Sequence, residues 1–147
     1  MILLADRDPA SGENKSMSAA EIPDGYRQLL EAPLYGVLAT VRPDGTAQAN
    51  PMWFELVDDT LRFTHTTVRA KYRNLQHNPS MSLAVYDPAE PLKYIEVPGR
   101  LIDVLPDPDA AYFRHLAARY GHSEFGVPGD APHRVALVMS MESFTTQ

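Results

Sequence analysis

A cluster of basic residues carries the clearest chemical signal in this sequence. Arg69, Lys71 and Arg73 follow a β-rich run and open a segment with helical spacing. Their guanidinium and ammonium groups, together with the free backbone N–H groups of a helix N-terminus, would suit an anion such as a phosphate group. Alternatively, these three residues form the solvent-exposed basic face of a short helix and bind no ligand. No carboxylate between Asp59 and Asp87 is present to neutralise these cations.

The run Asn50-Pro51-Met52-Trp53 is a second candidate site. It lies in the middle of a predicted strand, where Pro51 cannot donate a hydrogen bond to a neighbouring strand. The strand is therefore either at an edge or turned toward something else, such as a ring-shaped ligand that contacts the backbone. An edge strand with Trp53 packed in the core is the alternative.

Other common site patterns are missing from the sequence. The five histidines are scattered and none has metal-ligand spacing with a carboxylate, so we expect no metal site. His65 lies on a predicted strand, where it could contact a ligand or serve the structure. Gly-x-Ser-x-Gly, the P-loop and Gly-x-Gly-x-x-Gly do not occur, which excludes the hydrolases, nucleotide triphosphatases and dinucleotide-binding folds that need them.

Alternating apolar and polar residues predict a mainly β chain that positions these groups. The predicted helices cover residues 22–34, 68–77 and 110–120, the last capped by Asp107 and Asp109 and ended by Gly121. The predicted strands cover residues 35–41, 46–55, 61–66, 81–86, 94–104 and 135–139, with a bulge or bend at Pro98-Gly99. Six or so strands joined mostly by tight turns favour a small antiparallel barrel.

Length and composition narrow the class of protein. With 147 residues, the chain has room for one domain, which we place at 21–147 behind a polar, flexible tail at 1–20. The net charge of −6 argues against duplex nucleic acid and anionic membranes as partners. The lack of cysteine excludes thiol catalysis, and no apolar run is long enough to span a membrane. We expect a cytoplasmic location.

The sequence resembles the split-β-barrel flavin and deazaflavin oxidoreductases, the pyridoxamine-5′-phosphate-oxidase-like superfamily, and within it the F420-dependent branch. The resemblance is detailed from Tyr35 to Tyr86 and looser as far as Met139. The matching segments are Gly36-Val-Leu-Ala-Thr40, the Pro43-Asp-Gly45 turn, Gln48 to Phe54, Leu61-x-Phe-x-His-Thr66 and Arg69-Ala-Lys71-x-x-Asn74-Leu75-x-x-x-Pro79.

The resemblance implies a six-stranded antiparallel split β-barrel that forms a homodimer with a cofactor at the interface. It implies that F420, or alternatively FMN, is held there for hydride transfer to or from a small unsaturated or conjugated substrate. No side chain is an obvious catalyst, and solvent is one candidate proton source. The cofactor-binding residues it implies are Arg69 and Lys71 at the phosphate, Asn50, Pro51, Met52 and Trp53 along the ring, and Thr64 and Thr66 beside the phosphate and ribityl chain.

Two departures from the superfamily pattern bear on the cofactor. Authentic pyridoxamine-phosphate oxidases resemble one another in an Arg-x-Val-Leu-Leu-Lys strand, where this chain has Asn50-Pro-Met-Trp-Phe-Glu55, and in a C-terminal Arg-Leu-His segment that it lacks. These differences argue against vitamin B6 oxidation and favour F420 over FMN. An FMN-dependent oxidoreductase or oxidase, and a non-catalytic binder of flavin, F420 or haem, remain the alternatives.

Overall fold

The computed structural model describes residues 21–147; the predicted flexible tail at 1–20 lies outside the described residues. Within the described part the chain forms eight strands, three α-helices and one short 3-10 helix. The strands are β1 (Gly36–Val41), β2 (Ala47–Met52), β3 (Glu55–Val57), β4 (Thr60–Thr66), β5 (Ser80–Asp87), β6 (Glu90–Pro106), β7 (Arg134–Ser140) and β8 (Thr145–Thr146). The helices are α2 (Arg27–Glu31), α3 (Ala70–His77), α4 (Ala111–Arg119) and η2 (Ala131–His133).

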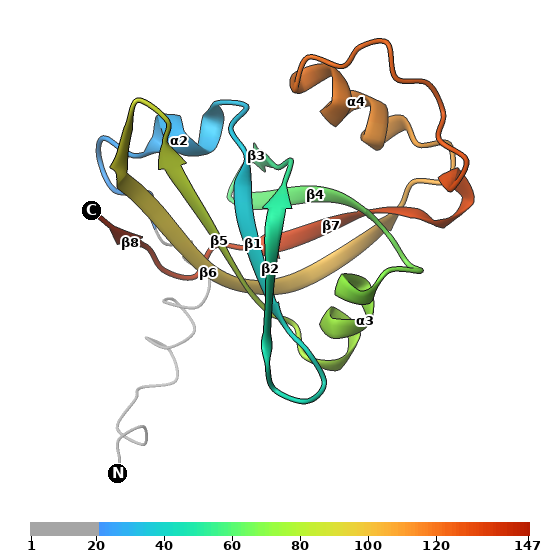
Figure 1. The fold of residues 1–147 in the computed structure, drawn as a ribbon, viewed down its shortest axis with the longest axis horizontal. Helices are drawn as coiled ribbons and strands as arrows, with labels where there is room; N and C mark the ends of the chain where they lie inside the picture. Colours follow the sequence, from blue (N-terminus) through green and yellow to red (C-terminus); the bar gives the residue numbers. More distant parts are fainter. Residues whose placement is uncertain (1–20) are drawn as a thin grey trace, which may run out of the picture.

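The strands form one antiparallel sheet that curls into a split barrel, as the family resemblance implies, with eight strands in place of the expected six (Figure 1). The order is β2-β1-β5-β6-β7-β4-β3, and β8 pairs with β6. The 17-residue β6 pairs with β5 over its first part and with β7 over its second. β2 and β4 do not pair with each other. The sheet is therefore open between them.

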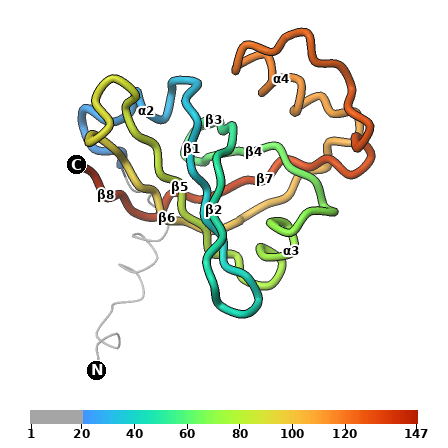
Figure 2. The backbone as a smooth tube through the Cα atoms, in the orientation of Figure 1, coloured from blue at the N-terminus to red at the C-terminus, as the bar shows by residue number. Residues whose placement is uncertain are grey.

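Two layers of apolar side chains hold this arrangement together. The barrel interior is filled from facing strands by fully buried residues that include Leu38, Phe63, Leu83, Val97 and Leu137. Their burial follows from the period-2 alternation of strand side chains. Outside the barrel, α4 packs on β4 and β7 and lies above them in Figures 1 and 2.

The structure corrects the predicted strand at 46–55. The chain bends at Trp53 and Phe54, so this segment contributes two strands, β2 and β3, to different parts of the sheet. Phe54 is fully buried, and its backbone N–H donates to the Tyr120 hydroxyl at 2.9 Å. This partner is 66 residues away along the chain. The break was therefore not evident in the local pattern.

Other boundaries also shift. The predicted helix at 22–34 shortens to α2, because Gly25 has a positive φ of 84° and forms a turn ahead of it. β6 is longer than predicted and has its irregularity between Leu101 and Asp103 rather than at Pro98-Gly99. A Cβ at Gly99 would lie 1.9 Å from the carbonyl oxygen of Ser140, so this glycine allows close backbone approach. β8 was not predicted.

The remaining elements agree with the sequence-based expectations. The carboxylate of Asp107 accepts the backbone N–H groups of Tyr112 and Phe113 at 3.0 and 3.1 Å, which confirms its role at the start of α4. β2 pairs only with β1, so Pro51 does lie in an edge strand. None of the helices in residues 21–147 has the length and apolar character needed to cross a membrane.

Candidate functional site

A pocket of about 260 Å³ lies where the open edge of β2 meets β4, the start of α3, α4 and the start of β7. The residues that line it are Tyr35, Asn50, Pro51, Met52, Trp53, Thr64, His65, Arg69, Phe113 and Arg134. Six of the eight predicted cofactor-binding residues are in this lining. The other two, Thr66 and Lys71, lie beside it on β4 and α3 and are buried.

The basic end of the pocket is formed by Arg69 and Arg134. Arg69 has extended backbone geometry immediately before α3. Arg134 is largely buried, and Asp130 binds it through two bonds, Nε to Oδ1 at 3.0 Å and Nη2 to Oδ2 at 3.2 Å. Its guanidinium also lies 4.5 Å from the centre of the Phe113 ring, and its Nη1 is 3.4 Å from Thr64 Oγ1. These contacts fix its orientation.

Lys71 is buried and is not a cation on the protein surface. Its side chain is 4% exposed, and its Nζ donates to Oδ1 of Asn50 on β2. Burial lowers the pKa of this ammonium group. Lys71 thus contacts the pocket lining through Asn50, whose amide NH₂ in turn donates to the Pro51 carbonyl oxygen at 3.1 Å. Its predicted contact with phosphate stays a prediction.

A second α3 residue, Asn74, also bonds across the opening of the barrel. Its Nδ2 donates to Gln48 Oε1 at 2.7 Å and to Thr40 Oγ1 at 3.2 Å. Both acceptors lie on the β1–β2 hairpin, whereas α3 follows β4 in the chain. α3 thus connects the end of β4, which it follows in the chain, to the β1–β2 hairpin by side-chain hydrogen bonds.

His65 is buried at the basic end. Its pKa falls to about 4, chiefly because of burial and also because of Lys71, Arg69 and Arg134 nearby. The imidazole is therefore neutral at pH 7. Its Nε2 has no hydrogen-bond partner, and neither does Oγ1 of the fully buried Thr66.

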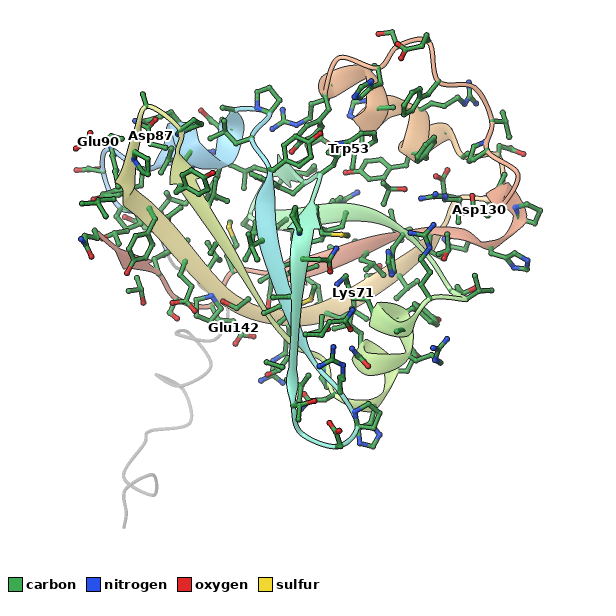
Figure 3. The ribbon with its side chains drawn as sticks, in the orientation of Figure 1. Trp53, Lys71, Asp87, Glu90, Asp130 and Glu142 are labelled. Atoms are coloured by element: carbon green, nitrogen blue, oxygen red, sulfur yellow. The ribbon has the colours of Figure 1, made fainter. Side chains whose placement is uncertain are left out.

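The other end of the pocket is aromatic. Trp53 stacks on Tyr120 at 5.3 Å and on His122 at 5.7 Å between ring centres, and Phe113 and Phe125 lie beside it at 6.2 and 6.4 Å. In Figure 3, Trp53 lies below α4, whereas Lys71 belongs to α3 at the opposite side of the pocket. Trp53 is thus held in a group of rings carried by α4 and the loop after it.

Several of these residues were not predicted from the sequence. Tyr35, Phe113 and Arg134 line the pocket but were not predicted to do so. Arg134 could be assigned to the pocket only from its position opposite Thr66 in the β4–β7 register. The sequence does not show that these two strands pair. Phe113 reaches the pocket because α4 packs on the outside of the barrel. No strand pattern encodes that docking.

The pocket as a whole suits a ligand with an anionic group joined to a flat ring system. Guanidinium groups bind phosphate oxygens through charge-assisted hydrogen bonds, and the aromatic side chains offer flat apolar surfaces. Within residues 21–147, no group of three or more histidine, aspartate or glutamate side chains is arranged to hold a metal ion.

Comparisons with known proteins agree with this description. The sequence model of the family described as pyridoxamine 5′-phosphate oxidase matches residues 22–147. A solved structure named F420 Reductase is 48% identical, with a TM-score of 0.83, over 86% of this chain and 100% of that one. No curated protein matches the chain.

More distant solved structures share the fold alone. General Stress Protein 26 from Bacillus anthracis is 20% identical, with a TM-score of 0.63, over 82% of this chain and 88% of that one. HupZ from Group A Streptococcus is 18% identical, with a TM-score of 0.63, over 86% of this chain and 94% of that one.

Proposed function

Because the chain belongs to the pyridoxamine 5′-phosphate oxidase family, we propose that it is an F420-dependent oxidoreductase. In this proposal a hydride passes between reduced F420 and a small unsaturated or conjugated substrate. The name of the 48% identical solved structure, F420 Reductase, supports the choice of F420 over FMN. The observation that carries the proposal is the pocket with a basic end at Arg69 and Arg134 and an aromatic end at Trp53.

The residues present fit such a cofactor. Arg69 and Arg134 would bind the phosphate, with Thr64 and Thr66 beside it; the unpartnered Oγ1 of Thr66 is a free hydrogen-bonding group there. Asn50, Pro51, Met52 and Trp53 would line the ring. Lys71 would contribute through its bond to Asn50 and through its charge.

In this proposal the cofactor and the protein chain have separate roles. The bound cofactor supplies the hydride chemistry, as redox cofactors do in general. The chain binds the phosphate, orients the ring and keeps water from one side of it through the aromatic group around Trp53. No described side chain has to act as an acid or base in this scheme.

A parallel equilibrium titration with F420 and FMN at one ionic strength tests the proposal. Trp53 is the sole tryptophan, so its fluorescence reports the pocket directly, and calorimetry gives an independent affinity. We expect tight F420 binding and weak FMN binding, followed by oxidation of reduced F420 when acceptors are added. Tighter FMN binding would favour the FMN-dependent alternative. F420 binding without turnover of any acceptor would favour a carrier.

We also propose that the protein works as a homodimer. Val37 on β1 and Tyr86 on β5 are exposed by 39% and 51%, although both are large apolar residues. They belong to an apolar groove of about 480 Å³ lined by Val37, Ala84, Val85, Tyr86, Pro91 and Tyr94. A second copy of the chain would cover this surface.

Sedimentation of the wild type and of Tyr86→Lys tests the proposed dimer. We expect the wild type to be a dimer and Tyr86→Lys to be a monomer, and a monomeric wild type would contradict the proposal.

A further inference from the structure

The ion pair between Arg134 and Asp130 places a negative charge next to the basic end of the pocket. The Asp130 carboxylate occupies the Nε and Nη2 side of the guanidinium, while Nη1 has only the long 3.4 Å contact to Thr64. The arginine side chain is 11% exposed and the aspartate side chain 31% exposed. Water therefore screens this pair less than it screens a surface pair.

The two cofactors considered above differ in the charge of their phosphate groups. The phosphodiester of F420 carries one negative charge, whereas the phosphate monoester of FMN carries nearly two at pH 7, since its second pKa is about 6. A carboxylate bound to the same guanidinium repels each negative charge that the ligand brings. The second charge of a monoester is thus opposed by Asp130 as well as attracted by the arginines.

We propose that Asp130 makes the pocket select a singly charged phosphodiester over a doubly charged phosphate monoester, an inference that rests on the proposed function. Asp130 is then a residue that determines cofactor specificity and also positions Arg134. Arg69, Lys71 and Arg134 all lie near the neutral His65 of β4, and the backbone N–H of buried Asp107 donates to the Arg134 carbonyl oxygen at 2.9 Å. The Asp107 carboxylate accepts from the backbone N–H groups of Tyr112 and Phe113, whereas the Asp130 carboxylate contacts the Arg134 guanidinium itself.

A matched pair of ligands isolates the charge of the phosphate. FMN and its methyl phosphodiester have the same ring and ribityl chain and differ in one charge and one methyl group. We would titrate both, together with F420, into the wild type, Asp130→Asn and Glu142→Gln at pH 8. Glu142 pairs with exposed Arg100, so its substitution removes the same charge from a pair beyond the other end of β7, away from the pocket (Figure 3).

We expect Asp130→Asn to lower the ratio of the FMN Kd to the diester Kd by roughly tenfold, the order expected for two partly buried charges across a guanidinium group. Glu142→Gln should leave that ratio within about twofold. Movement of Arg134 would weaken the doubly charged ligand more than the singly charged one and so raise the ratio, which is the opposite of the expected change. An unchanged ratio in Asp130→Asn, or an equal change in both variants, would overturn the inference.

The wild type alone gives a second measurement, which does not depend on the folding of a variant. FMN loses its second charge as the pH falls below about 6. The FMN Kd should therefore approach that of the diester at pH 5 and exceed it at pH 8. The diester corrects for titration of protein groups, and His65, with a pKa of about 4, stays neutral over this range. FMN that binds more tightly than the diester at pH 8 would overturn the inference.

The failure of this inference can be told apart from the failure of the proposed function. A wild type that binds neither F420 nor the flavins would remove both. A wild type that binds F420, with a flavin ratio that Asp130→Asn does not change, would remove only the role of Asp130.

Discussion

The two helices beside the pocket, α3 and α4, are attached to the barrel in different ways. α3 inserts the buried polar side chains Lys71 and Asn74, which bond to β2 and β1 across the open side of the barrel. α4 buries the apolar Leu116 and Ala117 on the outside of β4 and β7, and its Arg119 also donates to backbone carbonyl oxygens of Glu31, Ala32 and Phe54. Polar partners must match in position and geometry, whereas an apolar layer needs mainly the right volume. The apolar layer under α4 should therefore tolerate a change of side-chain shape better than the bonds of α3 tolerate the loss of a partner.

The largest expected effect comes from emptying the apolar layer under α4. Leu116 is fully buried, so Leu116→Ala should lower the free energy of unfolding by about 2 to 5 kcal/mol. Leu116→Met keeps the volume and should cost less than about 1.5 kcal/mol. Urea unfolding of both variants measures this difference. Equal losses in the two would mean that α4 also depends on exact shape.

Acid titration tests the basic end of the pocket. His65 has a pKa of about 4 in the folded protein and about 6.5 when unfolded, so the unfolded state binds more protons between these values. Stability is therefore complete above pH 6.5 and falls as the pH drops toward 4, by up to about 3 kcal/mol from this residue. His65→Gln should flatten that part of the curve relative to the wild type, and His77→Gln should not. Parallel curves for the wild type and His65→Gln would contradict the assignment.

Two arginines at the start of α3 allow the effect of local net charge on binding to be distinguished from the effect of a position in the pocket lining. Arg69 lines the pocket, whereas the Nη1 of exposed Arg73 donates to the backbone oxygen of Val68. Arg69→Ala should weaken binding of F420 by about 1.5 to 3 kcal/mol, the usual value of a charge-assisted bond. Arg73→Ala should have less than about a third of that effect, because Arg73 does not line the pocket and solvent screens its charge over the longer distance. Calorimetry decides, and equal losses would show that only the local net charge matters.

The smallest effect concerns the end of α4. The Tyr120 hydroxyl accepts from the Phe54 N–H and lies 2.7 Å from the Leu34 carbonyl oxygen, to which it can donate. Tyr120→Phe keeps the ring against Trp53 and removes these bonds, which should cost about 1 kcal/mol of stability. Thermal melting measures the loss. The stacked environment of Trp53, followed by its fluorescence, should change little, and a large spectral change would show that the hydroxyl also sets the ring stack.

The sequence was informative wherever short-range patterns determine the structure. Alternation identified β4, the Asp107 carboxylate marked the start of α4, and Pro51 indicated an edge strand. These features depend on residues close together in the chain. Six of the site residues implied by the family resemblance also meet in one pocket, on the β2 edge, on β4 and at the start of α3.

The remaining features depend on contacts between distant segments. The bend at Phe54 is bonded by Tyr120, and the orientation of Arg134 also depends on Phe113 and Thr64. Lysine is a residue type usually found at the surface, yet Lys71 is buried because α3 lies across the open side of the barrel. Propensity and spacing do not encode such placements. They follow from how the elements pack.

The length of β6 has a consequence for how the protein unfolds. This strand pairs with β5 up to Arg100 and with β7 from Leu101 onward, so both parts of the sheet share one continuous backbone. Neither part can lose β6 without exposing the fully buried Ile95 and Val97 or breaking the β7 pairing. The barrel should therefore melt as one cooperative unit. Amide hydrogens in the middle of β6 should exchange with solvent only when the whole domain unfolds.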